Sequence, residues 1–595
     1  MKAEILKFFK GDVEDDKETL LKYSHDASIF ELRPKLVVFP IDSEDVQNLV
    51  KWVKENKENK EKYGELSITS RAAGTDMSGG AIGESIILDF TRYMNKLIGW
   101  RQPEENSSAF LHLAGGTFRG ANSPQAASIT VQPGMFYRDF EKLTLEKGLI
   151  LPCFTASKTI NAMGGMFGNN SAGERTLKFG KTEDYILETK MVFADGIERI
   201  VKPIPLSEIS KHGEIYTKIF DLIKNNEEEI KNAKPHVHKN SAGYYIWNVV
   251  NQNRNQKNFV GGRFTPQAGG MPRNSFDFCF DLNKLLVGSQ GTLGIATEIT
   301  FKLVQEPKHT RLLVVFLRDM KILPDLVNKI LKYAPQSLES YDDKTFMLVL
   351  KYIKDFAKLL GLKNFFKLGL SFWPEALMTL RHGFPKIILL AEFTGDSQIE
   401  ADNQAQRTLE DLKSSHKIGI RLTKDKEEAK KYWTIRHEAF NLIRYHLKKV
   451  KSMPFVDDVI VKPERIPEFF PALYKILDVY KKRMTFAVGG HSGDGNMHIY
   501  TLVNPKDPNL KEMIIEVSNQ VYDLVTKLGG SITAEHNDGL IRTPYLNKMF
   551  DEKMIKIFAE IKEIFDPKDI FNPGKKVPTK SEGGTKEYIK EHIAF

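Results

Sequence analysis

The 595-residue sequence has few cysteines and no long apolar stretch. Only Cys153 and Cys279 occur, far apart and outside any paired motif. An iron–sulfur cluster needs about four thiolates and a disulfide framework needs several cysteines, so we expect neither within this chain. No segment approaches the roughly 20 apolar residues of a membrane span, and the start, MKAEILKFFKGDVEDDKE, lacks the core of a signal peptide. We therefore expect a cytoplasmic protein that could associate peripherally with the inner face of the membrane.

The chain is basic, with a net charge of +9 and a pI near 9.0. Its 41% hydrophobic and 27% charged residues are typical of a globular protein. The charge would suit an anionic substrate, an acidic carrier or an anionic membrane surface. Lysines are dispersed along segments such as KWVKENKENKEK, so we do not expect nucleic acid binding. The basic segment from Lys575 to Lys590 is expected to be a surface extension.

The segment 491–498, with the sequence HSGDGNMH, brings two imidazoles close together along the chain. Asp494-Gly495 is a dipeptide that tolerates positive φ in a two-residue hairpin loop, here between TFAVGG and MHIYTL. That hairpin pairs Gly493 with Asn496, Ser492 with Met497 and His491 with His498. Directly opposed Cβ atoms lie roughly 5 Å apart, so both imidazoles could chelate one metal ion.

A third ligand can come from AEHNDGLIR, where Glu535 offers a carboxylate and His536 an ionisable neighbour. Two histidines and an acid leave coordination positions open for a substrate. Zinc and manganese both accept such mixed ligands. A single histidine in a strand is more often a hydrogen-bonded structural residue, but two in facing register beside a Glu-His pair favour a metal site.

The segments alternate between strand-like and helical from residue 35 to about 200, with a helix that opens at Ser43 as its N-cap. The apolar residues on one face of this helix are Val46, Leu49, Val50 and Val53. Residues 205–280 break the pattern and are interpreted as an insertion. We expect an α+β protein with a first domain over 1–305, a second over 306–560, and residues 561–595 returning to the first domain before a basic tail.

Three glycine-rich segments lie in the predicted first domain: RAAGTDMSGG, NAMGGMFGNNSAG and GSQGTLG. Exposed backbone N–H groups in such loops can form a nest for an anion. The first lacks the lysine of a P-loop and is followed by a strand, unlike a dinucleotide-binding GxGxxG. Their joint occurrence favours a large cofactor that carries phosphate.

These motifs resemble the flavin-dependent D-2-hydroxyacid dehydrogenases, the family of D-lactate dehydrogenase, D-2-hydroxyglutarate dehydrogenase and the glycolate oxidase large subunit. The resemblance runs from about Tyr23 to Lys576. The sequences YSHDASIFELRPKLVVFP and KNSAGYYIW are most similar to members fused to an iron–sulfur domain, which we do not expect here. The resemblance implies a vanillyl-alcohol-oxidase/PCMH-type FAD-binding domain and an α+β substrate-binding cap.

The resemblance also implies non-covalent FAD, because Thr75 or Asp76 stands where covalent relatives carry histidine. GSQGTLGI differs from the family's GSEGTLGI by Gln290. The residues assigned to FAD are Arg71, Ala73, Gly74, Thr75, Asp76, Ser78, Gly79, Pro133, Gly134, Gly164, Gly165, Asn170, Ser171, Gly173, Gly291, Thr292, Gly294, Ile295 and Asn572.

For the cap, the resemblance assigns a divalent metal, Zn or Mn, to His491, His498 and Glu535. It makes His536 a catalytic base of near-neutral pKa, although Asn537 replaces the usual glycine. Arg436 in YWTIRHEAF matches an arginine that grips the substrate carboxylate; a surface arginine is the alternative. The expected reaction is oxidation of a 2-hydroxy acid, with the metal lowering the hydroxyl pKa and hydride passing to flavin N5.

We therefore expect an enzyme that oxidises a small D-2-hydroxy acid, such as D-lactate or D-2-hydroxyglutarate. Its electrons would pass to an external iron–sulfur protein, electron-transfer flavoprotein or quinone. The alternatives are an ether-forming enzyme of the alkyl-glycerone-phosphate synthase type, a hydrolase without flavin, and a non-catalytic flavoprotein subunit. The sequence leaves substrate, metal and oligomeric state open.

Overall fold

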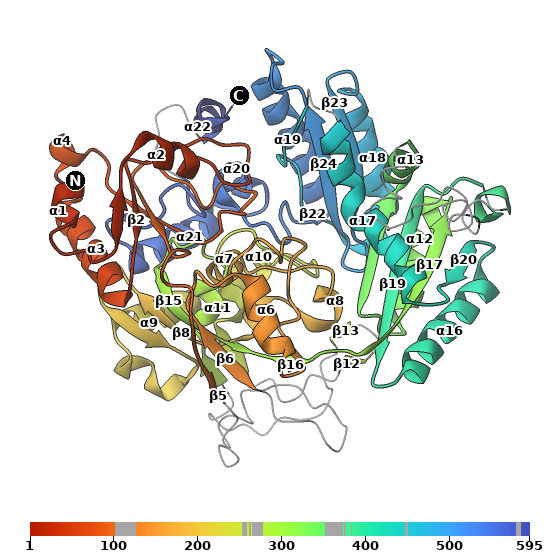
Figure 1. Ribbon diagram of the computed structural model, residues 1–595, viewed down its shortest axis with the longest axis horizontal. Helices are drawn as coiled ribbons and strands as arrows, with labels where there is room; N and C mark the ends of the chain where they lie inside the picture. Colours follow the sequence, from red (N-terminus) through yellow and green to blue (C-terminus); the bar gives the residue numbers. More distant parts are fainter. Residues whose placement is uncertain are drawn as a thin grey trace.

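The computed structural model describes residues 1–101, 127–252, 259–260, 263–264, 278–351, 373, 377–381, 383–446, 450–578 and 585–594. Much of the second half of the predicted insertion lies outside this part of the chain. Two lobes meet along a central seam, with the amino-terminal lobe on the left of Figure 1 and the second lobe on the upper right. Among the described helices, none combines the length and the apolar character that a membrane span requires.

One sheet of the amino-terminal lobe has the strand order β1-β2-β4-β3, and β4 is parallel to both β2 and β3. Helix α3 (Ser43–Asn56) buries the predicted apolar face, which confirms that expectation. Its N-cap is Asp42 instead of Ser43, because the Asp42 carboxylate accepts the N–H of Asp45. The strands are β1 (Asp12–Glu14), β2 (Leu36–Phe39), β3 (Ile68–Arg71) and β4 (Ile86–Asp89).

The second sheet of this lobe is antiparallel and has the order β5-β6-β15-β8-β9. Its strands are β5 (Leu97–Arg101), β6 (Ser128–Val131), β8 (Ile186–Val192), β9 (Glu198–Val201) and β15 (Ile295–Lys302). The helices beside it are α6 (Tyr137–Leu145), α7 (Met163–Asn169) and α11 (Asn283–Leu286). Short elements complete the lobe: α1 (Lys2–Ile5), α2 (Lys17–Tyr23), α4 (Lys60–Tyr63), α8 (Thr176–Phe179), β7 (Leu149–Ile150), β12 (Phe259–Val260), β13 (Arg263–Phe264) and β16 (Val304–Gln305).

The insertion contributes a small sheet and two helices to the same core. Its elements are β10 (Ile204–Pro205), α9 (Glu214–Asn225), α10 (Glu227–Ala233), β11 (Val250–Gln252) and β14 (Phe278–Phe280). Tyr216, Ile219 and Ile230 are buried in the hydrophobic cluster that also contains residues of the second sheet. The insertion is therefore an integral part of the lobe.

The second lobe is built on an antiparallel sheet with the order β20-β17-β19-β18-β23-β24-β21, and β22 also pairs with β24. Alternate residues of β17 face opposite sides: Leu313 and Val315 join one apolar cluster, and Leu312 and Val314 the other. The strands are β17 (His309–Leu317), β18 (Ser337–Asp342), β19 (Ile387–Gly395), β20 (Gly419–Leu422), β21 (Lys451–Ser452), β22 (Val459–Ile460), β23 (Met484–His491) and β24 (Asn496–Val503). The helices are α12 (Leu323–Leu331), α13 (Asp343–Lys351), α16 (Gln398–Ser415), α17 (Lys426–His446), α18 (Ile466–Asp478) and α19 (Leu510–Lys527).

Helix α20 (Gly539–Arg542) places Leu540 and Ile541 in the apolar cluster of the second lobe, and the chain returns to the amino-terminal lobe by α21 (Glu552–Phe565), earlier than the predicted residue 561. Figure 1 shows α21 within that lobe. The last helix, α22 (Thr585–His592), places Ile589 in the core of the second lobe. Lys575 and Lys576 are also buried, so the prediction of a surface tail is wrong. Apolar residues interleaved with the lysines give this segment a face that packs.

Asn572 fastens the carboxyl-terminal segment to two glycine loops. Its Oδ1 accepts a hydrogen bond from Thr69 Oγ1 at 3.0 Å, and its Nδ2 donates to the carbonyls of Gly80 and Gln290 at 2.8 and 2.7 Å. The segment therefore holds the first and third glycine loops together.

Replacement of Asn572 by alanine should lower the free energy of unfolding by about 2–4 kcal/mol, because it leaves buried carbonyl groups without donors. Chemical denaturation checks this value. Asn519→Ala is the matched control, since the Asn519 side chain bonds only within α19 and should cost less than about 1 kcal/mol. Equal losses in both variants would contradict the fastening role.

Candidate functional site

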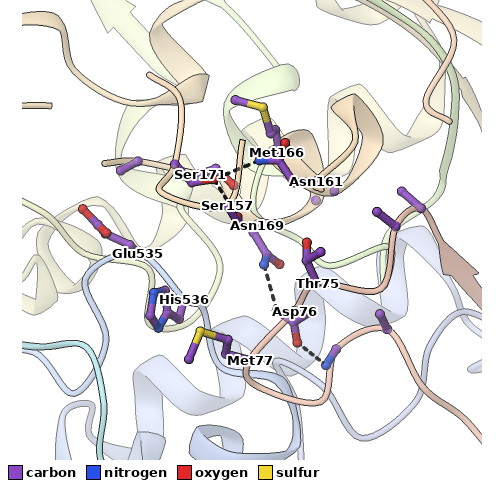
Figure 2. Close-up of a pocket in the computed structure, with 18 of the residues that line it drawn as sticks. Thr75, Asp76, Met77, Ser157, Asn161, Met166, Asn169, Ser171, Glu535 and His536 are labelled. Carbon is purple, nitrogen blue, oxygen red and sulfur yellow. Dashed lines mark hydrogen bonds between the residues drawn. The ribbon is translucent and has the colours of Figure 1, made fainter. Parts of the chain in front are cut away.

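A cavity of about 320 Å³ lies between the two lobes. Figure 2 shows Thr75, Asp76 and Asn169 on one side of it and Glu535 and His536 on another. The predicted residues that line it are Arg71, Ala73, Gly74, Thr75, Asp76, Pro133, Gly164, Gly165, Ser171, Gly173, Gly291, Gly294, Arg436, His491, His498, Glu535 and His536.

Seven predicted cofactor residues stand behind the cavity wall: Ser78, Gly79, Gly134, Asn170, Thr292, Ile295 and Asn572. They shape the loops. Asn170, for example, ends α7 in the left-handed conformation and accepts the N–H of Glu183 at 2.9 Å. Ile295 lies in an apolar core. All three predicted glycine-rich loops contribute residues to the cavity, and which residues of a loop face it depends on the backbone path of that loop.

The first glycine loop converges on an anion, as a nest would. That anion is the carboxylate of Asp76, whose Oδ2 accepts Ser78 N, Ser78 Oγ and Gly80 N at 3.0, 2.7 and 2.6 Å. Its Oδ1 accepts Asn169 Nδ2 at 2.7 Å, a contact drawn in Figure 2. The loop therefore holds its shape through an internal acid.

The hairpin of β23 and β24 carries the two histidines in a different register from the predicted one. His491 pairs with Asn496, and Gly489 pairs with His498, around a four-residue loop. The prediction of a two-residue loop is wrong, because Gly495 N closes a wider turn onto the His491 carbonyl at 3.0 Å. The two imidazoles become diagonal neighbours on one face, and their Nε2 atoms are 3.3 Å apart.

Each imidazole has its Nδ1 atom bound to a carboxylate. Nδ1 of His491 lies 2.6 Å from Glu339 Oε1, and Nδ1 of His498 lies 3.2 Å from Asp457 Oδ1. Such partners fix the tautomer that leaves Nε2 as a bare electron pair. Two electron pairs at this separation repel unless a proton or a metal ion lies between them. Burial opposes a charge on His491, but Glu339 outweighs it and raises the His491 pKa to about 9.

Glu535 completes a triangle of possible metal ligands. Its Oε2 lies 3.4 Å from Nε2 of His491 and 3.9 Å from Nε2 of His498. Tetrahedral ligands at zinc bond lengths of about 2.0–2.1 Å are separated by roughly 3.3–3.4 Å, so these three atoms could hold one ion.

A second grouping consists of Asp458, His498, Glu535 and His536, whose candidate ligand atoms lie within 4.8 Å of one another. Asp458 is poorly suited to ligation, because its Oδ2 accepts the backbone N–H groups of residues 534, 535 and 536 at 3.0, 2.8 and 2.7 Å. Its Oδ1 accepts Asn496 Nδ2 at 3.0 Å. Asp458 instead anchors the turn that presents Glu535 and His536.

His536 stands beside this triangle, with its ring stacked on His498 at 5.2 Å. Its Nδ1 lies 3.3 Å from Asp457 Oδ2. Burial lowers the His536 pKa, but Asp458 and Asp457 outweigh that effect and raise it to about 9. This pKa lies above the near-neutral value that we expected.

Arg436 reaches the cavity from α17 with its side chain 9% exposed, so it is not a surface arginine. Its Nη1 lies 3.3 Å from the Tyr500 hydroxyl, and its Nη2 lies 3.3 Å from Glu339 Oε2. The Nε atom is buried and has no hydrogen-bond partner among the described residues. A guanidinium with a free donor can bind a carboxylate.

Lys239 is a site residue that we did not predict. It comes from the insertion, is fully buried, and forms ion pairs with Glu535 and, at 2.9 Å, with Asp494 Oδ2. Burial lowers the pKa of Lys239, but the two carboxylates raise it above its usual range. Glu339 and Asp457 were missed as well, since neither belongs to a spaced motif; the double aspartate in FVDDV is the only sequence signal.

Comparisons with known proteins agree with this architecture. Residues 34–201 match a family model described as "FAD binding domain", and residues 306–576 match "FAD linked oxidases, C-terminal domain". The chain is 24% identical to D-2-hydroxyglutarate dehydrogenase of Pseudomonas putida over 95% of its own length, and it spans half of that protein. It is 24% identical to glycolate oxidase subunit GlcD of Bacillus subtilis, covering 94% of the chain and 93% of the relative. It is 25% identical to D-lactate dehydrogenase of Anaerostipes hadrus, covering 93% of the chain and 92% of the relative.

Solved structures share the fold. A 4-ethylphenol oxidase from Gulosibacter chungangensis superposes with a TM-score of 0.62 at 13% identity, over 97% of both chains. An alkyldihydroxyacetonephosphate synthase superposes with a TM-score of 0.60 at 16% identity, over 97% of this chain and 85% of the synthase. The amino-terminal lobe is a vanillyl-alcohol-oxidase/PCMH-type FAD-binding domain, and the second lobe is the cap. The chain is a member of the FAD-linked oxidase family.

Proposed function

We propose that this protein oxidises a D-2-hydroxy acid to the 2-oxo acid, with non-covalently bound FAD and a divalent metal ion at His491, His498 and Glu535. The observation that carries the proposal is the pair of Nε2 atoms 3.3 Å apart in a wall of the FAD-side cavity. Arg436 lines the same cavity and can bind a carboxylate. Relatives named D-2-hydroxyglutarate dehydrogenase and D-lactate dehydrogenase support this substrate class.

The residues divide the chemistry among them. When bound, FAD would supply a hydride acceptor, and a divalent ion held by His491, His498 and Glu535 would supply a Lewis acid that lowers the pKa of the substrate hydroxyl group. Arg436 holds the carboxylate and thereby decides which hydrogen of the substrate carbon faces the flavin. His536 takes the hydroxyl proton, and it can do so once its ring is neutral; a neighbouring cation lowers its pKa toward that state.

The electrons leave through an external acceptor, for which an iron–sulfur protein, an electron-transfer flavoprotein and a quinone are all suitable. The chain is basic, so an acidic carrier could dock by charge. An ether-forming reaction is less suited to this site, because it makes no use of a metal triangle beside an arginine.

Anaerobic titration of the FAD-loaded protein with D- and L-2-hydroxy acids tests the proposal. We expect the D-enantiomers to bleach the flavin. Removal of metal by a chelator should slow this reduction by at least about a hundredfold, or roughly 3 kcal/mol of transition-state stabilisation. Zinc or manganese should restore it. His498→Ala should match the chelated protein, and His416→Ala, at a surface ion pair with Asp325, is the control. Unchanged reduction after metal removal would refute the metal's role.

Replacement of His536 by alanine should leave FAD bound and slow flavin reduction by at least about a hundredfold, the range for a lost general base. In the wild type, reduction should accelerate as pH rises, with a midpoint at or below the His536 pKa of about 9, because the neutral ring is the active form. Stopped-flow absorbance between pH 5 and pH 10 checks both points. Persistence of this pH limb in the variant would assign it to another group.

Gly165 of α7 provides a test of where FAD binds. A Cβ atom added there would meet only Ala72 Cβ, at 3.9 Å, so a side chain would project into the cavity. Gly165→Leu should weaken FAD binding by at least about tenfold, since overpacking costs 1–3 kcal/mol, without loss of helix stability. Absorbance of purified protein and FAD titration measure it. Gly99→Leu, with open space on β5, should bind FAD normally. If Gly165→Leu bound FAD with wild-type affinity, the placement of FAD in this cavity would be contradicted.

A further inference from the structure

The dipeptide His238-Lys239 of the insertion touches both halves of the proposed metal site. His238 Nδ1 contacts Asp494 Oδ1 in the loop between the two histidines. Lys239 Nζ contacts Asp494 Oδ2 at 2.9 Å and also Oε1 of Glu535. One cation therefore joins the loop of the histidine hairpin to the proposed acidic ligand.

The backbone around Lys239 is held firmly against the Glu535 turn. Ser241 N donates to the Thr533 carbonyl at 3.1 Å, and Ser241 Oγ donates to the Ala534 carbonyl at 2.8 Å. Gly243 N donates to Asp538 Oδ2 at 2.8 Å. These bonds fix the origin of the lysine side chain relative to the acid, so the position of its ammonium group is determined by the fold.

The two oxygens of Glu535 consequently have different surroundings. Oε1 is engaged by Lys239, and Oε2 faces Nε2 of His491 at 3.4 Å. A carboxylate with one oxygen bound to an ammonium group has a single oxygen left for a metal ion. Zinc favours few ligands in a tetrahedral arrangement. Larger, harder ions gain from additional oxygen donors, which a bidentate carboxylate supplies.

We propose that Lys239 is a positioning residue that restricts Glu535 to one donor oxygen and thereby biases the site toward zinc over manganese. This inference rests on the proposed function, because it requires a metal ion at His491, His498 and Glu535. It gives the insertion a role in the chemistry of the site: Lys239 sets the denticity of the acid without touching substrate or cofactor.

The experiment measures dissociation constants for Zn²⁺ and Mn²⁺ by competition with a chromophoric chelator, on FAD-loaded protein stripped of metal. The main variant is K239M/D494N, which removes a buried positive and a buried negative charge together and so avoids an unpaired carboxylate at position 494. The matched control is D494N, which leaves the Lys239–Glu535 ion pair in place. Single K239M is compared where it folds, as judged by circular dichroism and FAD content.

We expect the double variant to bind Zn²⁺ about 10–100-fold more weakly, the usual effect of losing a partner of a metal ligand, and to bind Mn²⁺ no more weakly than the wild type. The dissociation constant for Mn²⁺ divided by that for Zn²⁺ should therefore fall at least about tenfold in K239M/D494N and stay within about twofold in D494N.

An unchanged ratio in the double variant would overturn the positioning role, even if both affinities fell together. A similar fall of the ratio in D494N would assign the effect to the loop. A wild-type protein that binds neither ion would overturn this inference together with the metal site, whereas wild-type binding with an unaltered variant would overturn this inference alone.

Discussion

Two imidazoles direct ring nitrogens at each other across 3.3 Å, an arrangement in which their electron pairs repel unless a proton or a metal ion lies between them. Three carboxylates surround the two imidazoles and add negative charge beside them. Glu339 and Asp457 occupy the outer nitrogens, and Glu535 approaches the inner ones. Each acid would be costly to bury alone, and the cationic side chains of Lys239 and Arg436 beside them offset part of that cost. The register of β23 and β24 brings the two imidazoles to these acids.

Hydrogen bonds between the lobes set the position of the turn that carries Glu535 and His536 relative to the glycine loops. Leu540 N and Ile541 N donate to the Ser78 carbonyl at 2.8 and 3.2 Å, and Gly539 N donates to Gln290 Oε1 at 2.8 Å. The turn that presents His536 is thus bonded to the same loops that line the FAD-side cavity. An amide at position 290 suits this place, since it donates to Ser78 Oγ as well; a carboxylate would stand beside Asp76.

Local patterns in the sequence predicted much of the molecule. Apolar periodicity and alternation placed α3 and the strands around the glycine loops, and motifs found many of the residues that line the cavity. The predicted register of the hairpin was wrong because Asp494 forms ion pairs with His238 and Lys239. These residues lie some 250 positions earlier in the chain, so no local sequence rule contains the contact. Glu339 and Asp457 escaped notice for the same reason: their roles come from β18 and from the chain before β22 meeting β23 and β24. The tail was misjudged because charge dominated its composition, while two isoleucines decided its packing.

Residues near the two ends of the chain contact each other. Phe30 near the amino terminus pairs with Ile593, and Glu31 N donates to the His592 carbonyl at 2.9 Å, while Ile589 lies in the cap core. Both termini thereby form a clasp across the seam between the lobes. A hinge motion that swung the cap away from the amino-terminal lobe would have to break these terminal contacts and the hydrogen bonds at the Ser78 carbonyl at once.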